Sequence, residues 1–231
     1  MQVLALDAAT NACSAALWRD GRVMARRFQA LTRGHAEVLM PMVQAVATEA
    51  GVAVGAVDLF AVTVGPGAFT GIRIGLAAAR GMALAAGRPC LGVTTMAAVA
   101  EAVPEAERQR APLLVVLETK RADVYAQAFA PDVTPFGEAR ALPLSELVAT
   151  AHALARRFVL VGDAAARVAG PLAEAGIAIE PSTAPGLPDA AVVATVAARR
   201  WQVLGAPAVL EPPRPLYLRA PDVTFPGGRG R

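Results

Sequence analysis

The chain has 231 residues, of which 55% are hydrophobic and 18% charged, and its formal net charge is +3. This length permits one large domain or two lobes of about 100 residues each, and the composition excludes a disordered chain. The small positive charge, without a dense cluster of lysine or arginine, does not argue for a nucleic-acid-binding protein.

Cysteine usage and the N-terminus point to an intracellular chain. Cys13 and Cys90 lie in apolar, strand-like segments, so we expect two buried thiols rather than a disulfide or a zinc site. The N-terminus lacks a signal-peptide pattern, and the apolar stretch 70–86 carries Arg73 and Arg80, which argues against a membrane span. We therefore expect a cytoplasmic protein.

The first half of the chain predicts the order β-β-β-α-β-α-β-α. Alternating and apolar runs predict strands, and helical spacing of apolar residues predicts the helices. The expected strands cover 3–7, 13–18, 22–29, 59–64 and 89–93, and the expected helices cover 35–50, 70–86 and 95–103. Pro41 falls early in the first helix and could kink it or move its start.

The stretch 58–87 is the most informative part of the sequence. Gly65-Pro66-Gly67 ends a strand, and Thr70 is the predicted N-cap of the next helix. Gly71 and Gly75 share one face of that helix, which implies that another backbone comes very close. That backbone could belong to the protein's own sheet or to a partner, and the residues alone leave both open.

The second half repeats the pattern after a charged linker. Strands are expected at 113–118, 123–129, 136–142, 158–161 and 177–179. Helices are expected from an N-cap at Ser145, over 163–175, and from a cap at Asp189 to about Leu204. The segment 104–112 is the predicted linker. A proline-rich extended tail follows over 207–215, with a disordered end at 226–231.

The two halves match at one place. The segments LALDAATNACSAALW and VVLETKRADVYAQAF both read as a strand, an acid, a short step and a second strand, with Asp7 and Glu118 as equivalent acids. This repeat predicts an α/β, two-lobed actin/sugar kinase/Hsp70-like (ribonuclease H-like) fold with duplicated βββαβαβα units. We place the N-terminal lobe at 1–105 and the C-terminal lobe at 106–231, with about the last 25 residues as an extended tail.

Five motifs resemble those of one bacterial family. They are LALDAATNACSAAL, RGHAEVLMPMV, VTVGPGAFTGIRIGLAAARGMALA, PCLGVTTMAAVA and PLYLR. In this order, from Val3 to Arg219, they resemble the TsaB (YeaZ) family, whose members are subunits of the tRNA threonylcarbamoyladenosine system. Glu118 departs from the family pattern, which has an aspartate there.

The resemblance implies a non-catalytic scaffold. Such a subunit binds TsaD, the catalytic subunit that forms N6-threonylcarbamoyladenosine at position 37 of tRNAs reading ANN codons, and TsaE joins the larger assembly. For this chain it implies a heterodimer with a TsaD homologue, a TsaE homologue in the larger assembly, a homodimer when alone, and contact with tRNA only through the complex. It implies no membrane partner.

The residues present argue against catalysis and cofactor binding. A TsaD-like metal site needs a His-x-x-x-His pair, but Thr95 and Val99 occupy the matching positions, and His35 and His152 are the only histidines. The turns 8–11 and 119–122 have no glycine for a phosphate. We therefore assign no catalytic, cofactor-binding or metal residue and expect no cofactor, no bound transition metal and weak binding of tRNA alone.

The alternatives are a free-standing ATP-dependent small-molecule kinase of the same superfamily and, less favoured, a metallopeptidase. Asp7 is either a turn-capping residue or a ligand, and Tyr217 and Arg219 are expected to dock the tail on the body.

We expect the partner interface on the helices 35–50 and 70–86, with spare apolar surface beside a glycine groove. Its candidate residues are His35, Leu39, Val43, Val46, Gly71, Arg73, Ile74, Gly75, Ala78 and Met82.

Overall fold

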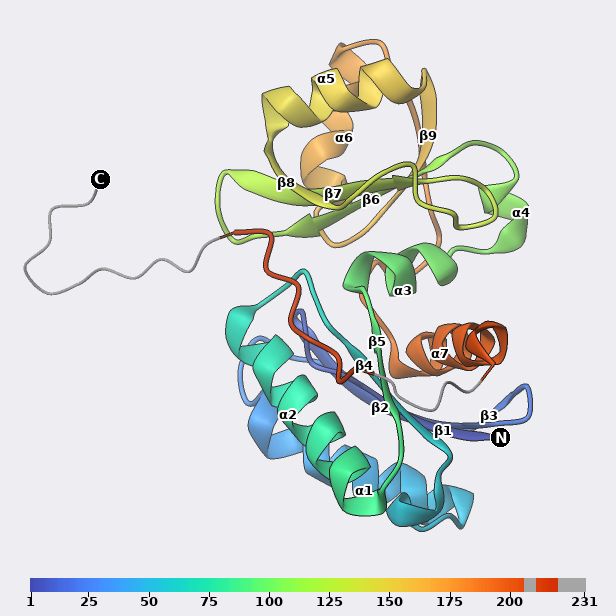
Figure 1. Cartoon of the computed structure of the whole chain (residues 1–231). Coiled ribbons are helices and arrows are strands. Elements are labelled where there is room, and N and C mark those ends of the chain that lie inside the picture. Colours follow the sequence, from blue (N-terminus) through green and yellow to red (C-terminus); the bar gives the residue numbers. More distant parts are fainter. Residues whose placement is uncertain (206–210, 220–231) are drawn as a thin grey trace, which may run out of the picture.

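Two five-stranded mixed sheets form two lobes, one above the other, with a helix at the waist between them (Figure 1). The computed structural model describes residues 1–205 and 211–219. The strand order is β3-β2-β1-β4-β5 in the first sheet and β10-β9-β6-β7-β8 in the second. The predicted two-lobed α/β fold with a repeated unit is confirmed.

The central strands of the first sheet are buried on both faces, as their apolar sequences require. Its elements are β1 Gln2–Asp7, β2 Ala12–Arg19, β3 Arg22–Ala30, α1 His35–Ala50, the 3-10 helix η1 Val54–Ala56, β4 Leu59–Thr63, α2 Phe69–Ala86, β5 Cys90–Val93 and α3 Thr95–Glu101. Strand β1 pairs antiparallel with β2 and parallel with β4. The carboxyl ends of β1, β4 and β5 therefore meet at one edge, which faces the second lobe.

The second sheet repeats this arrangement with shorter helices. Its half of the chain contains α4 Glu105–Arg108, β6 Leu113–Glu118, β7 Asp123–Phe129, β8 Arg140–Pro143, α5 Leu144–Leu154, β9 Arg157–Val161, α6 Ala165–Glu174, β10 Ala178–Pro181 and α7 Ala190–Leu204. Strand β6 takes the place of β1, because it pairs antiparallel with β7 and parallel with β9. The predicted linker contains the short helix α4.

Helix α7 returns from the second half of the chain to cover the first sheet. Val193, Ala194 and Ala197 pack in one cluster with Val3 and Ala5 of β1. The predicted cap is confirmed, since the Asp189 carboxylate accepts a hydrogen bond from the Ala191 N–H at 2.8 Å. The predicted boundary between the two lobes, at residues 105 and 106, stays a prediction. Helix α7 lies after that boundary in the sequence but packs on the sheet of the first lobe.

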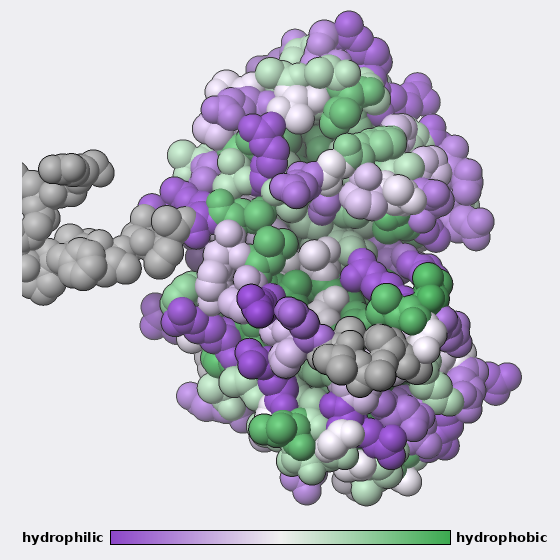
Figure 2. Space-filling view, in the orientation of Figure 1, coloured by the Kyte–Doolittle hydropathy of each residue, from purple (hydrophilic) through white to green (hydrophobic). Residues whose placement is uncertain are grey.

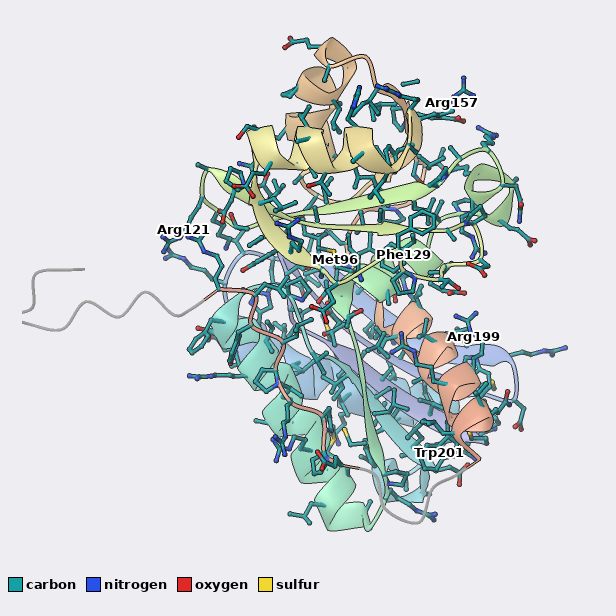
Figure 3. All side chains as sticks on the ribbon, turned by 45° about the horizontal axis from the view of Figure 1, so that its top comes forward. Met96, Arg121, Phe129, Arg157, Arg199 and Trp201 are labelled. Atoms are coloured by element: carbon teal, nitrogen blue, oxygen red, sulfur yellow. The ribbon has the colours of Figure 1, made fainter. Side chains whose placement is uncertain are left out.

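The waist is an apolar core shared by both lobes. Met96 and Val99 of α3 are buried against Leu117 of β6 and Phe129 of β7. Figure 3 shows Met96 and Phe129 close together at this junction. Helix α3 also contributes Ala97 and Ala98 to the cluster beneath α7, so this one short helix joins the two lobes.

Three local predictions need correction. Helix α2 begins at Phe69 with Ala68 at its N-cap and no side-chain cap, so Thr70 is not the cap. Helix α5 likewise begins after Pro143, not at a Ser145 cap. The third strand of the second sheet covers only 140–143. The expected start of α1 at His35 is confirmed, with Pro41 inside the helix.

The described ranges leave out part of the predicted tail. Residues 206–210 and the predicted disordered end at 226–231 lie outside them. Within 1–205 and 211–219, no helix is long and apolar enough to cross a bilayer.

Candidate functional site

The first candidate site is the cleft between the lobes, at the carboxyl end of β1. Asp7 is fully buried there, and its Oδ1 accepts hydrogen bonds from the Thr63 hydroxyl at 2.6 Å and the Ala9 N–H at 3.1 Å. Its Oδ2 has no hydrogen-bond partner among the described residues. Burial raises the pKa of Asp7 to about 7 against the opposing effect of these bonds. The contacts favour the turn-capping role over a ligand role.

Two glycines, one just before α2 and one in its first turn, pack against the turn after β1. A Cβ at Gly71 would overlap the carbonyl oxygen of Ala8, and one at Gly67 would overlap that of Ala9. The Ala68 N–H also donates to the Ala9 carbonyl at 2.7 Å. Backbone therefore touches backbone at the turn that follows β1. Of the two interpretations left open for the glycine face, internal packing is the one that the geometry supports.

The second lobe closes the cleft with charged groups. The Arg167 guanidinium pairs with Glu118 at 2.9 Å and donates to the carbonyl oxygens of Arg121 and Asp123 at 2.8 Å each. The Glu118 N–H donates to Asp163 Oδ1 at 2.8 Å. Burial raises the pKa of Asp163 above its usual range. Glu118 thus takes part in an internal network of the second lobe.

Little space remains between the two lobes. The cavity measures about 50 Å³ and is lined by Asn11 and Gly67 from one lobe and by Lys120 and Tyr125 from the other. Small-molecule sites measure about 300–1,000 Å³, so the cleft in this arrangement is too small for a nucleotide. No group of three or more metal-ligating side chains occurs within the described ranges.

The predicted interface residues fall into two groups. Leu39, Val43 and Val46 are at most 1% exposed and belong to the core of the first lobe. Gly71 and Gly75 face their own chain, with a Cβ at Gly75 meeting Val62 Cγ2 at 3.3 Å. The expected spare apolar surface and surface glycine groove are therefore absent at these five residues, because the chain itself covers them.

The other predicted residues are at least partly accessible. Ile74, Ala78 and Met82 are partly buried against the core of the first lobe. His35 is half-buried, with Nε2 2.9 Å from the Thr10 carbonyl oxygen. Arg73 is exposed on α2. Whether any of them binds a partner stays a prediction.

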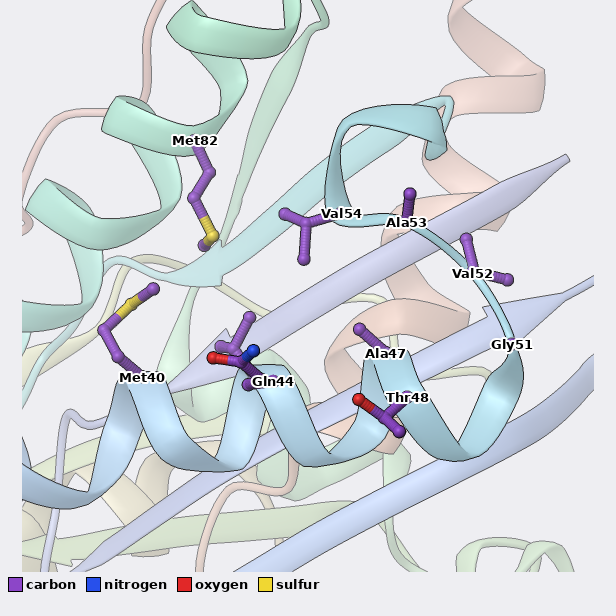
Figure 4. A pocket seen from close by; sticks show the side chains of 10 residues that line it. Met40, Gln44, Ala47, Thr48, Gly51, Val52, Ala53, Val54 and Met82 are labelled. Atoms are coloured by element: carbon purple, nitrogen blue, oxygen red, sulfur yellow. The ribbon is translucent and has the colours of Figure 1, made fainter.

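A surface groove runs between α1, η1 and α2. It has a volume of about 590 Å³ and is lined by Met40, Val43, Gln44, Ala47, Thr48, Gly51, Val52, Ala53, Val54 and Met82. Figure 4 shows Met40 and Met82 reaching into it from the two helices. Met40 is 46% exposed. Met40 was not among the predicted interface residues because it lies off the inward-facing stripe of α1, although an exposed methionine beside that stripe was a usable signal.

The repeated mixed sheets, with an acid ending the first strand of each, define a two-lobed protein of the actin/sugar kinase/Hsp70 class. A dehydratase activator from Clostridium difficile has the same fold, with a TM-score of 0.51 and 12% identity over 88% of this chain and 98% of that one. YeaZ from Pseudomonas aeruginosa is much more similar, with a TM-score of 0.78 and 32% identity over 94% and 99%.

Sequence comparisons agree with this structural likeness. Residues 29–155 match the family model described as "TsaD: tRNA N6-adenosine threonylcarbamoyltransferase". Escherichia coli TsaB, a tRNA threonylcarbamoyladenosine biosynthesis protein, is 45% identical over 44% of this chain and 43% of its own length. An uncharacterized Mycobacterium bovis protein is 33% identical over 95% of this chain and 92% of its own. The chain belongs to the TsaB/YeaZ family and is related to tRNA threonylcarbamoyladenosine biosynthesis.

Proposed function

We propose that this chain is the non-catalytic scaffold subunit of the complex that forms N6-threonylcarbamoyladenosine at position 37 of tRNAs reading ANN codons. In this role it binds and supports a TsaD homologue, and a TsaE homologue joins the larger assembly. The observation that carries the proposal is the open groove between α1 and α2 in a member of this family. The chain contacts tRNA only through the complex.

The groove has the chemistry of a protein-binding surface. Met40 and Met82 supply flexible apolar side chains, and Gln44 and Thr48 supply polar groups beside them. Methionines adapt their shape to a partner, and an apolar hollow with a polar rim is common at interaction sites. In the absence of a TsaD homologue, we expect the same face to form the homodimer.

The cleft supports a non-catalytic role. Thr95 and Val99 are buried in α3 at the positions where a TsaD-like metal pair would need histidines. The interlobe cavity measures about 50 Å³ in this arrangement, and the backbone contacts of Gly67 and Gly71 fill the turn beside it. These features count against the kinase alternative, which requires a nucleotide between the lobes.

Co-expression with the TsaD homologue of the same cell, followed by gel filtration, tests the proposal. The variant is Met40→Glu, which places a charge in the groove. Met24→Glu is the matched control, because Met24 on the edge strand β3 is 41% exposed, close to the 46% of Met40. Burial of a charge in an apolar interface is costly, so we expect Met40→Glu to weaken both the heterodimer and the homodimer about tenfold or more.

Circular dichroism must show that both variants remain folded, which their exposed positions favour. The control should assemble like the unmodified protein. Normal assembly of a folded Met40→Glu variant would refute the groove as the partner surface. Failure of the unmodified chain to bind the TsaD homologue would refute the scaffold function itself.

A further inference from the structure

The segment Glu211–Arg219 crosses the waist of the molecule from the first lobe to the second (Figure 1). It begins beside β5, where Pro213 lies against the position of Gly92. The Leu216 N–H then donates to the Val64 carbonyl at 2.7 Å. A Cβ at Gly65 would lie 2.6 Å from the Leu216 carbonyl oxygen. The segment therefore fits directly onto the glycine turn that follows β4.

Aromatic and cationic contacts hold the segment on α2. The Tyr217 ring lies 5.0 Å from the Phe69 ring, and the Arg73 guanidinium lies 3.6 Å from the centre of the Phe69 ring. Arg73 Nε donates to the Tyr217 hydroxyl at 3.0 Å. Aromatic pairs of this kind stabilise beyond the burial of their surface area. Arg73, a predicted interface residue, is thus bound by the chain's own tail.

The far end of the segment is attached to the second lobe. Arg219 Nη1 lies 2.9 Å from Asp123 Oδ1 and 2.8 Å from Oδ2. The Asp123 side chain is only 16% exposed and also accepts from the Thr119 hydroxyl at 2.7 Å. Thr119 belongs to the turn after Glu118. Within the described residues, this ion pair connects the tail through Asp123 to the turn that lines the interlobe cleft.

We propose that residues 211–219 act as a clasp that holds the two lobes closed across their cleft. The shared core around Met96 of α3 provides one attachment between the lobes, and the clasp provides another. Figure 2 shows hydrophobic side chains gathered around this waist. With the Arg219–Asp123 pair broken, the lobes can rotate about α3 and enlarge the cleft, which measures about 50 Å³ when closed.

Pulsed electron spin resonance on the full chain tests this proposal. Spin labels are attached to Thr70→Cys on α2 and Glu138→Cys in the second lobe, both exposed positions. The native Cys13 and Cys90 are buried, and burial raises the pKa of each thiol to about 12, so both resist labelling. The test variant is Arg219→Ala. The matched control is Arg214→Ala in the same segment, whose pair with Glu211 is 82% exposed on both sides.

The clasp predicts a narrow distance distribution in the unmodified chain and in the control. Arg219→Ala should increase the population at a second, shifted distance about fivefold, which corresponds to about 1 kcal/mol. Asp123→Asn should give the same distribution, and the double variant should add nothing, because both changes break one pair. A distribution for Arg219→Ala that superimposes on that of the unmodified chain would overturn the proposal, as would additive broadening in the double variant.

Discussion

Asp7 and Glu118 occupy the same place in the two lobes but meet opposite environments. Each ends the first strand of its sheet and begins the turn to an antiparallel neighbour. Asp7 is fully buried, whereas the Glu118 side chain is 28% exposed and pairs with Arg167. A repeated topology therefore does not repeat the chemistry of its equivalent acids.

The helix that follows the next parallel strand explains the difference. In the first lobe, α2 brings Gly71 against the turn, so two backbones touch and water is excluded from Asp7. In the second lobe, α6 brings Arg167, whose guanidinium binds the turn carbonyls and Glu118. Glycine at position 71 of α2 lets two backbones meet and bury Asp7. Arginine at position 167 of α6 instead supplies a cation that pairs with Glu118.

Adding a methyl group to α2 should break the first arrangement. We expect Gly71→Ala to lower the free energy of unfolding by about 3 kcal/mol or more, because the new Cβ overlaps the Ala8 carbonyl oxygen. Urea denaturation measures this. Gly81→Ala on the same helix is the control, since its Cβ would meet nothing within 4 Å, and it should stabilise by about 0.5–1 kcal/mol. Equal effects of the two substitutions would contradict the close packing.

The buried acid should make stability depend on pH. The pKa of Asp7 rises from 3.8 to about 7 on folding, so the folded state binds the proton more tightly. The stabilisation is full below pH 3.8 and is lost as the pH rises through about 7. Asp7→Asn should flatten this fall, which has a limiting slope of roughly 1.4 kcal/mol per pH unit. Urea denaturation at several pH values between 4 and 8 tests it.

Asparagine at position 7 keeps a side-chain oxygen that accepts hydrogen bonds from the Thr63 hydroxyl and the Ala9 N–H. Asp7→Asn therefore removes the titrating carboxyl group and changes little else. Glu138→Gln, at an exposed position, is the control and should leave the pH dependence unaltered. If Asp7→Asn and the unmodified chain lose stability in parallel between pH 4 and 7, the buried carboxyl is not the titrating group.

The charged network of the second lobe should be the weaker of the two arrangements. Arg167→Ala removes the pair with Glu118 and two hydrogen bonds to carbonyls, all partly exposed. We expect a loss of about 1–2 kcal/mol in the free energy of unfolding. Arg167→Lys should recover little of it, because an ammonium group cannot reproduce the planar fork of a guanidinium. Full rescue by lysine would show that charge alone matters.

Much of the secondary structure could be predicted from local patterns. The periodicity that placed α1 at 35–50 and the Asp189 cap of α7 are confirmed. The caps at Thr70 and Ser145 were wrong, because a hydroxyl residue near a helix start signals a cap only when the backbone leaves the helix there. Local sequence does not fix the backbone angles of the first helical residues when a glycine turn or a proline precedes the helix.

The sequence by itself determined the order of elements, the duplicated plan and the close approach demanded by Gly71 and Gly75. It did not determine what lies opposite them, because helical periodicity gives the direction of a side chain and not its neighbour. Tertiary structure decided that Ala8 and Val62 of the same chain fill that place, and that Leu39 and Val43 are core rather than spare surface. It also decided that α7 packs against β1 and that the tail runs from α2 to Asp123. These contacts join residues far apart in sequence, where no local pattern records them.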